Sequence, residues 1–146
     1  MTVTHDNLPL LLLKARESSV ACIRAVLSDA SLTEQQWRVI RTLALAGELN
    51  AQDLANQSCI LSPSLSRILA RLEADKIIIR KVDATDQRAL NLKLSAKGKR
   101  LHDRLAPRVD KQYQMLVKEA GKDTIVKLAS LLEKFNTSTT PAAENG

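Results

Sequence analysis

The stretch SPSLSRILARLEADKIIIRKVDATDQRALNLKLS, residues 62–95, decides the fold. It opens as an amphipathic helix, with Ser62 as the expected N-cap, a proline at the first helical position and apolar residues every three or four positions. Residues 77–82 are then rich in β-branched side chains, residues 83–87 favour a turn, and residues 90–94 alternate between leucine and polar residues. The sequence therefore predicts a helix followed by a β-hairpin.

Three further helices are predicted before this stretch. Apolar residues recur at helical spacing over residues 8–30. The second helix starts at Thr33, because Thr33 and Gln36 have the spacing of a capping box, and it stops at Gly47. The third, short helix begins with Asn50, whose side chain can cap free backbone amides.

Two more helices are predicted after the hairpin. Ser95 caps a long helix, and Pro107 in its interior is expected to bend it or to start a new segment. The last helix covers residues 123–135. Residues 137–146 are small and polar and are expected to be frayed or disordered.

This order of elements predicts a mainly α fold with a small β-hairpin wing, a winged helix-turn-helix that places its last helix in a major groove. We expect an N-terminal dimerisation helix in residues 1–30, the DNA-binding domain in residues 31–100, dimerisation helices in residues 101–136 and a disordered tail in residues 137–146. The terminal helices carry apolar stripes too wide for so small a module to bury, which favours a symmetric dimer. The alternative is a monomer in which those helices pack against the winged module.

Composition and motifs exclude several classes of protein. With 146 residues, 45% of them apolar and only 2% aromatic, the chain suits one helical domain better than a strand-dense barrel. No apolar stretch approaches the roughly 18 residues of a membrane span, and no signal peptide is visible, so a cytoplasmic location is expected. No enzyme motif is present and the histidines and cysteines are scattered singly, so neither a catalytic site nor a metal site is predicted.

The positive charge is concentrated in the middle of the chain. Residues 62–100 hold ten basic and four acidic residues, whereas the remaining residues hold twelve of each, so this segment carries the whole net charge of +6. Such a basic segment is the electrostatic footprint of a surface that meets a polyanion, although a solvated charged face is the alternative.

The residues of this segment suit the two grooves of DNA. Backbone amides at a helix N-terminus attract phosphate, and arginine can pair with guanine. The helix that starts at Ser62 is therefore suited to read DNA bases directly, unless its arginines pair within the protein. On the hairpin, Asp86 can hold Arg88 in one orientation for the minor groove, unless the two form only a weak surface ion pair. The candidate DNA contacts are Ser62, Ser64, Ser66, Arg67, Arg71, Arg80, Lys81, Asp86, Arg88 and Lys93.

The hairpin segment Asp86-Gln87-Arg88-Ala89-Leu90-Asn91-Leu92-Lys93-Leu94-Ser95, followed by Ala96-Lys97-Gly98, resembles the Asp-x-Arg wing of the MarR family of bacterial transcription regulators. The resemblance spans residues 8–135. Within the family, residues 32–38 and 59–67 are most similar to the regulators of homoprotocatechuate (4-hydroxyphenylacetate) degradation operons.

The resemblance implies a homodimer that binds a palindromic operator as a repressor of an aromatic catabolic operon and releases it when a small phenolic or aromatic acid binds. The resemblance implies no cofactor, and the effector is the small molecule that such a regulator binds. Such ligands bind between the dimerisation helices and the winged domain, where a carboxylate needs a guanidinium and a ring needs an apolar wall. The alternatives are that Trp37 is simply a core residue and that Arg16 forms a salt bridge within its helix or between subunits. The candidate ligand contacts are Arg16, Ser19, Ile23, Trp37, Arg41 and Arg67.

Two other functions remain open from the sequence. Some MarR-like proteins sense peroxides through a first-helix cysteine, and Cys22 is so placed, but the sequence offers no neighbouring tyrosine or histidine to activate a thiolate. The protein could also be a dimeric module that binds another protein's acidic surface instead of DNA.

Overall fold

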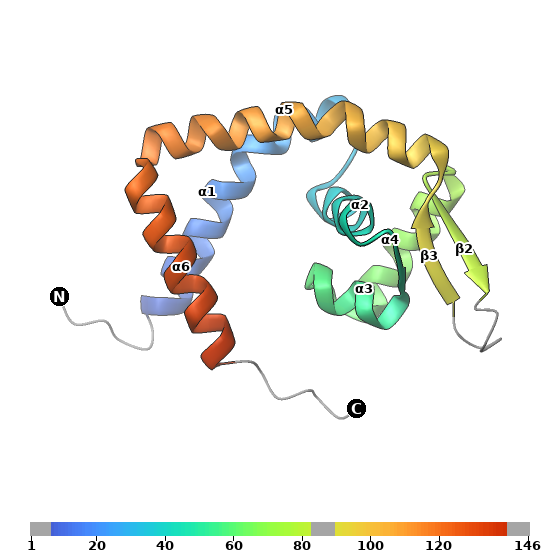
Figure 1. Cartoon of the computed structure of the whole chain (residues 1–146), viewed down its shortest axis with the longest axis horizontal. Coiled ribbons are helices and arrows are strands. Elements are labelled where there is room, and N and C mark those ends of the chain that lie inside the picture. The colour runs from blue at the N-terminus through green and yellow to red at the C-terminus, as the bar shows by residue number, and fades with distance from the viewer. Residues whose placement is uncertain (1–6, 83–89, 140–146) are drawn as a thin grey trace.

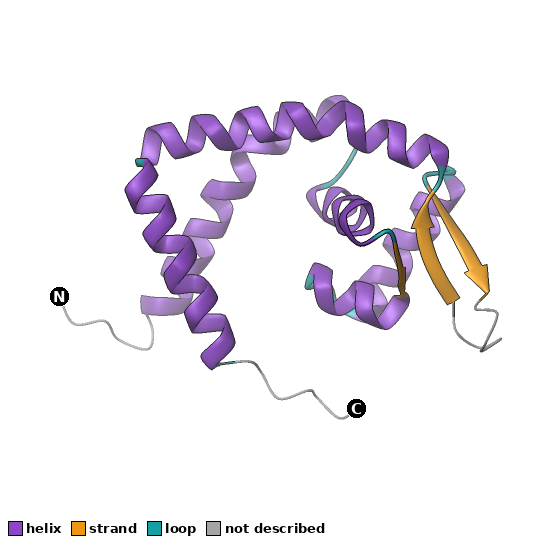
Figure 2. Cartoon of the chain, in the orientation of Figure 1, coloured by secondary structure: helices purple, strands orange, loops and turns teal. Residues whose placement is uncertain are grey.

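The computed structural model describes residues 7–82 and 90–139. Within these ranges the chain forms helices joined to a small sheet (Figures 1 and 2). The elements are α1 (Asn7–Asp29), α2 (Glu34–Ala46), β1 (Glu48–Asn50), α3 (Ala51–Ser58), α4 (Ser62–Ala74), β2 (Ile78–Val82), β3 (Leu90–Leu94), α5 (Ala96–Ala120) and α6 (Lys122–Ser138). The predicted winged helix-turn-helix, mainly α with a hairpin wing, is confirmed.

The long helix α5 connects the two ends of the molecule. Figure 1 shows α2, α3, α4 and the sheet gathered beneath one end of α5, whereas α6 and the N-terminal part of α1 lie at the other, where both line one groove. Helix α1 also runs back along α5, where Ile23 and Leu27 of α1 and Leu105 and Val109 of α5 are buried in the same core. Because the core continues from the winged module into this helix pair, α5 couples the wing to the terminal helices.

The sheet holds a strand that sequence analysis missed. The strand order is β1-β3-β2, and both pairings are antiparallel. The β2–β3 hairpin was predicted, but β1 has only three residues and pairs Leu49 with Leu92 of β3, far along the chain. A strand this short, formed by a long-range pairing, leaves no periodic pattern of its own.

Most helix boundaries follow from local capping chemistry. Thr33 and Gln36 form the predicted capping box, Asn50 caps α3, and Ser95 caps α5 through the amide of Gly98. The expectation for Ser62 is wrong by one residue, because α4 begins at Ser62 and Leu61 occupies the N-cap without a side-chain hydrogen bond to the described residues.

The C-terminal helices differ from expectation at two places. Of the two effects expected of Pro107, the start of a new segment does not occur, because α5 is one continuous helix through this residue. Helix α6 extends to Ser138, so the expected tail begins later, and the Thr137 and Ser138 hydroxyls donate to carbonyl oxygens four residues earlier at 2.8 Å. The rest of that tail, residues 140–146, lies outside the described residues.

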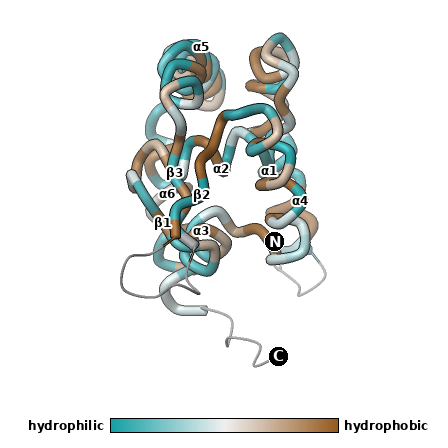
Figure 3. Tube along the Cα trace, turned by 90° about the vertical axis from the view of Figure 1, so that its right-hand side faces the viewer, coloured by the Kyte–Doolittle hydropathy of each residue, from teal (hydrophilic) through white to brown (hydrophobic). Residues whose placement is uncertain are grey.

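The apolar residues of the two terminal helices are not all covered. Figure 3 shows apolar and polar residues interleaved along the helices, as amphipathic elements require. In α1 burial begins only at Val20, and none of the described residues of α6 is buried. No described helix is both long and apolar enough to cross a membrane.

Candidate nucleic-acid interface and ligand cavity

Helix α4 separates core residues from candidate DNA contacts. Its buried face consists of Leu65, Ile68, Leu69 and Leu72. Ser62, Ser66, Arg67 and Arg71 are exposed on the remaining surface, and Ser64 is half-buried. The helix therefore presents hydroxyl and guanidinium groups together, as a helix that reads a major groove would.

The two arginines of α4 differ in their partners. Arg71 Nε donates to Asp75 Oδ2 at 3.1 Å, which is the internal pairing that sequence analysis had kept as an alternative. Arg67 has no polar partner among the described residues. Its guanidinium is thus the one in α4 that can engage guanine without first breaking an ion pair.

The described basic residues of the hairpin have different surroundings. Arg80 pairs with Glu73 of α4, and Lys81 is exposed opposite Asn91. Lys93 instead lines a hollow against α5, together with Lys99 and other residues. Asp86 and Arg88 lie outside the described residues.

A tight junction fixes the base of the hairpin against α5. The Ser95 hydroxyl donates to the carbonyl of Lys76 at 2.6 Å, and Lys97 Nζ donates to the carbonyl of Asp75 at 2.8 Å. Gly98 lies so close to the Ile77 carbonyl that a Cβ atom there would clash with the backbone. This contact sets where the wing meets α5, and no pattern in the sequence reveals it.

A second candidate site is a cavity of about 280 Å³ between α1, α2 and α5. It brings together three of the six candidate ligand contacts, Ile23, Trp37 and Arg41. The others do not line it: Arg16 and Ser19 lie on α1, and Arg67 lies on α4. The remaining lining residues are Glu34, Arg38, Thr42, Val109, Asp110 and Tyr113.

The wall of the cavity combines an aromatic surface with a cation. Trp37 is 5% exposed, so it is a core residue as well as a lining residue, and its ring stacks on His102 with centroids 5.5 Å apart. Arg41 Nη1 lies 2.9 Å from His102 Nε2. Arg41 has no carboxylate partner among the described residues.

Glu34 is the centre of an ion-pair network that sequence analysis missed. Its carboxylate accepts from Arg16 Nη2 of α1 at 3.1 Å and from Arg38 Nε and Nη2 at 3.1 and 2.9 Å. Arg38 Nη1 also donates to the carbonyls of Ser58 and Cys59, at 3.0 and 3.2 Å. The network thus runs from α1 through the cavity wall to the turn that leads into α4. Glu34 and Arg38 are four residues apart on α2, but Arg16, Ser58 and Cys59 come from other segments, so the sequence does not show the network as a whole.

Tyr113 is a further lining residue that sequence analysis did not select, and it lies near Cys22. Burial first, and then the charge of Cys22, raise the pKa of Tyr113. Burial also raises the pKa of the Cys22 thiol, whose Sγ donates to the Ser19 carbonyl at 3.0 Å. The sequence offers no tyrosine next to Cys22, whereas the fold brings Tyr113 close enough for the two groups to interact electrostatically. The raised pKa of Cys22 nevertheless disfavours the thiolate that a peroxide sensor needs.

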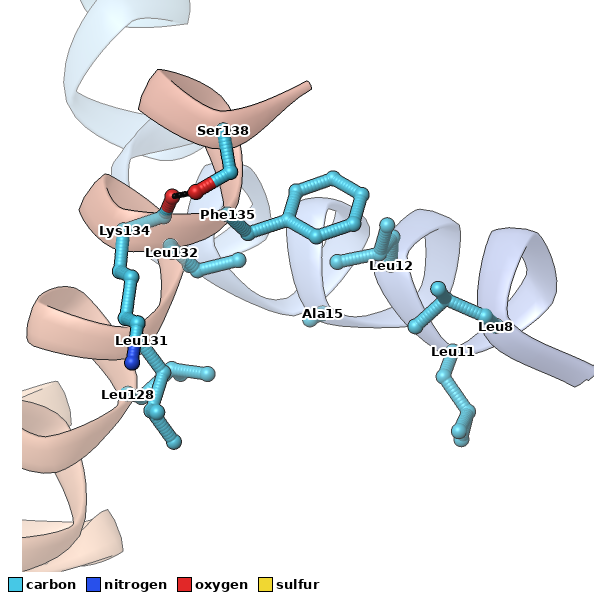
Figure 4. A pocket seen from close by; sticks show the side chains of 10 residues that line it. All are labelled: Leu8, Leu11, Leu12, Ala15, Leu128, Leu131, Leu132, Lys134, Phe135 and Ser138. Atoms are coloured by element: carbon cyan, nitrogen blue, oxygen red, sulfur yellow. Dashed lines mark hydrogen bonds between the residues drawn. The ribbon is translucent and has the colours of Figure 1, made fainter. Parts of the chain in front are cut away.

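A third hollow, of about 590 Å³, lies between the outer parts of α1 and α6 (Figure 4). Apart from Lys134 and Ser138, its lining residues are apolar. Figure 4 shows Phe135 and Leu132 of α6 directed toward Leu12 of α1. Leu131, which also lines the groove, is 65% exposed, so this groove leaves a large apolar surface uncovered.

A three-helix module with an arginine-bearing α4, a wing and long terminal helices defines a winged helix-turn-helix transcription regulator. Comparison with known proteins narrows this class. The sequence profile described as "MarR family" matches residues 32–90. The chain is 41% identical over 131 residues to the HTH-type transcriptional regulator FarR of Neisseria gonorrhoeae, covering 90% of each chain. The protein belongs to the MarR family.

Two further relatives point to one branch of that family. The chain is 37% identical over 131 residues to the homoprotocatechuate degradative operon repressor of Escherichia coli, covering 90% of this chain and 88% of the repressor. It is also similar to the crystal structure of NadR in complex with 4-hydroxyphenylacetate, with 39% identity and a TM-score of 0.79, covering 92% of this chain and 96% of NadR. Transcription regulation is thus favoured over a module that binds only other proteins.

Proposed function

We propose that the protein is a homodimeric repressor that binds a palindromic operator and releases it when a small aromatic carboxylate enters the cavity between α1, α2 and α5. The observation that carries this proposal is the cavity itself, because Arg41 and Trp37 of the helix-turn-helix module both line it. The activity is binding rather than catalysis. Because its target is DNA, the protein acts in the cytoplasm.

Dimerisation is supported by the uncovered terminal helices. A 17-residue helix such as α6 gains little stability from propensity alone and needs a packed apolar face, yet none of its described residues is buried. Exposed apolar patches of this kind mark interaction sites. A second copy would bring the same groove with it, so the two grooves can cover each other about a twofold axis.

DNA binding is supported by the charge and placement of α4. The segment that contains α4 and the hairpin carries the whole positive excess of the chain. Arg67 lies exposed on α4 without a polar partner among the described residues, and serines precede it toward the helix N-terminus. In a dimer the two copies of α4 would enter successive major grooves about 34 Å apart.

The choice of effector rests on the chemistry of the cavity. Its volume of about 280 Å³ is near the lower end of ligand pockets, so it suits a molecule with a single ring. Arg41 can pair with a carboxylate, Trp37 provides an apolar wall, and the Tyr113 hydroxyl can bond a phenol. The names of two relatives, one a homoprotocatechuate operon repressor and one bound to 4-hydroxyphenylacetate, support the same class of ligand.

The Glu34 network offers a route from the cavity to the DNA-binding helix. The carboxylate of a bound effector would compete with Glu34 for the guanidinium of Arg38, because Glu34 and Arg38 both line the cavity. Any shift of Arg38 changes its bonds to the Ser58 and Cys59 carbonyls, just before α4. The effector can weaken DNA binding only to the extent that it binds the shifted state more tightly.

The test is a gel shift with DNA upstream of the protein's own gene and its neighbours. We expect one fragment to bind at least about a thousandfold more tightly than random duplex, with an affinity that falls steeply with salt. Adding 4-hydroxyphenylacetate or 3,4-dihydroxyphenylacetate should release that fragment, whereas phenylalanine should not. Equal binding of all duplexes would overturn the proposal, and specific binding that no aromatic acid alters would overturn its effector.

A further inference from the structure

Leu61 is the most exposed large apolar residue in the described part of the chain. Its side chain is 80% exposed, whereas Ile60 before it is 6% exposed and Leu65 after it is 2% exposed. It occupies the N-cap of α4, immediately before Ser62. The leucine thus lies at the end of the helix that carries the candidate base contacts, but outside the core.

The N-cap position also makes leucine an unfavourable choice for helix stability. Ser, Thr, Asp and Asn at this position bond the free amides of the first turn, and leucine is among the least favoured residues there. Leu61 has extended backbone angles, φ −64° and ψ 142°, which suit such a cap, yet it gives α4 no side-chain hydrogen bond within the described residues. Leu61 therefore serves neither the core nor the start of the helix, and residues that break local rules in this way tend to lie at functional sites.

The position and the chemistry of the residue together point to a partner. In helix-turn-helix proteins, residues at the N-terminal end of the recognition helix reach the base edges in the major groove. Thymine alone presents a methyl group there, and apolar side chains contact it. We propose that Leu61 packs against the C5-methyl group of a thymine in each operator half-site, and so adds apolar readout to the polar readout by Arg67. This inference rests on the proposed function.

The same chain provides a matched control. Leu45 is 74% exposed, close to the value for Leu61, but it lies on α2 in a shallow hollow with Thr42, Ala46 and Gln57. Leu61→Ala and Leu45→Ala therefore remove the same exposed apolar group from two places, only one of which is the N-terminal end of α4. Since alanine is also a poor N-cap, Leu61→Ala should leave the melting temperature unchanged.

The experiment combines these variants with an operator in which each thymine is replaced in turn by uracil, a change that removes only the methyl group. We expect one thymine per half-site whose replacement weakens binding of the unaltered protein roughly three- to fivefold, the effect of about one buried methyl group. Replacing it in both half-sites should multiply the two effects. Leu61→Ala should bind the thymine operator more weakly and show no further loss with uracil, whereas Leu45→Ala should behave like the unaltered protein.

The outcomes separate this inference from the proposed function. If the protein binds its operator specifically but no thymine methyl group matters, or if Leu61→Ala loses as much affinity on uracil substitution as the unaltered protein, the inference is wrong and the regulator remains. If no duplex is bound better than random DNA, the proposed function fails and the inference fails with it. Leu61→Met keeps an apolar side chain and should keep the dependence on thymine.

Discussion

Arg41 and His102 lie in direct contact, with Arg41 Nη1 2.9 Å from His102 Nε2. Because a guanidinium can only donate, Nε2 accepts this bond, and the ring proton lies on Nδ1, 3.1 Å from Asp103 Oδ1. The contact therefore orients Arg41 without neutralising it. A cation is thus held in place in the same cavity wall as Trp37, where the proposed aromatic carboxylate would bind.

The first prediction concerns this cation. Arg41→Gln should weaken binding of 4-hydroxyphenylacetate roughly tenfold to a hundredfold, the range for a lost hydrogen bond between charged groups, and should leave operator affinity nearly unchanged. Isothermal titration of the free protein measures the first quantity and fluorescence anisotropy of a labelled operator the second. Arg24→Gln is the control, because Arg24 pairs with Glu17 on the exposed side of α1. If Arg41→Gln binds the effector as tightly as the unaltered protein does, Arg41 is not an effector contact.

The second prediction concerns the link to α4. Arg38→Lys should lower the free energy of unfolding by about 1–3 kcal/mol, because a single ammonium cannot span both Glu34 and the Ser58 and Cys59 carbonyls at the C-terminal end of α3. It should also weaken the effect of the effector on operator affinity. Arg108→Lys, which alters the exposed pair with Asp29, should cost less than about 1 kcal/mol in urea unfolding. Equal losses in both variants would contradict a special role for Arg38.

The third prediction concerns the apolar groove. Leu131→Asp should turn the dimer into a monomer in analytical ultracentrifugation, because a second copy could not bury the carboxylate without a partner. Its operator affinity should fall as well, since one subunit reaches only one half-site. Leu45→Asp places the same charge at a similarly exposed leucine of α2 and should remain dimeric. If the Leu131→Asp variant stays dimeric, the dimer interface does not lie in this groove.

The fourth prediction follows from the raised pKa of Cys22. Its ordinary value is 9.0, and burial raises the pKa in the folded protein, so the folded state keeps a proton that the unfolded state has lost. The stabilising contribution is therefore complete below 9.0 and is lost as the pH rises through the folded pKa. Urea unfolding at about pH 8 and about pH 10 should show a smaller loss of stability for Cys22→Ser than for the unaltered protein.

The sequence predicted the parts of the fold that local chemistry controls. Thr33 with Gln36, Asn50 and Ser95 all cap the helices they were expected to cap. It did not predict β1, because a strand of three residues depends on a partner far along the chain. The sequence also left open whether Pro107 bends the long helix or starts a new segment, and only the structure shows that α5 continues through it.

The candidate sites divide in the same way. Arg67 and Arg71 follow from their spacing on one helix, but only the structure shows that Arg71 already has a partner in Asp75. Tyr113 could not be selected, because no motif marks a residue whose role arises from side chains on other helices. Glu34 forms a local pair with Arg38 on α2, but its contact with Arg16 depends on how α1 packs against α2. Long-range assembly thus decides which of the polar residues face the cavity.

The central claim is that an effector bound in the cavity and operator DNA weaken each other's binding to the protein. The most direct measurement is the operator dissociation constant, by fluorescence anisotropy, over increasing concentrations of 4-hydroxyphenylacetate. We predict a rise that saturates, together with an equal factor of weakening when the effector is titrated into the protein–operator complex instead of the free protein. An operator dissociation constant that stays the same while the effector demonstrably binds would contradict the account.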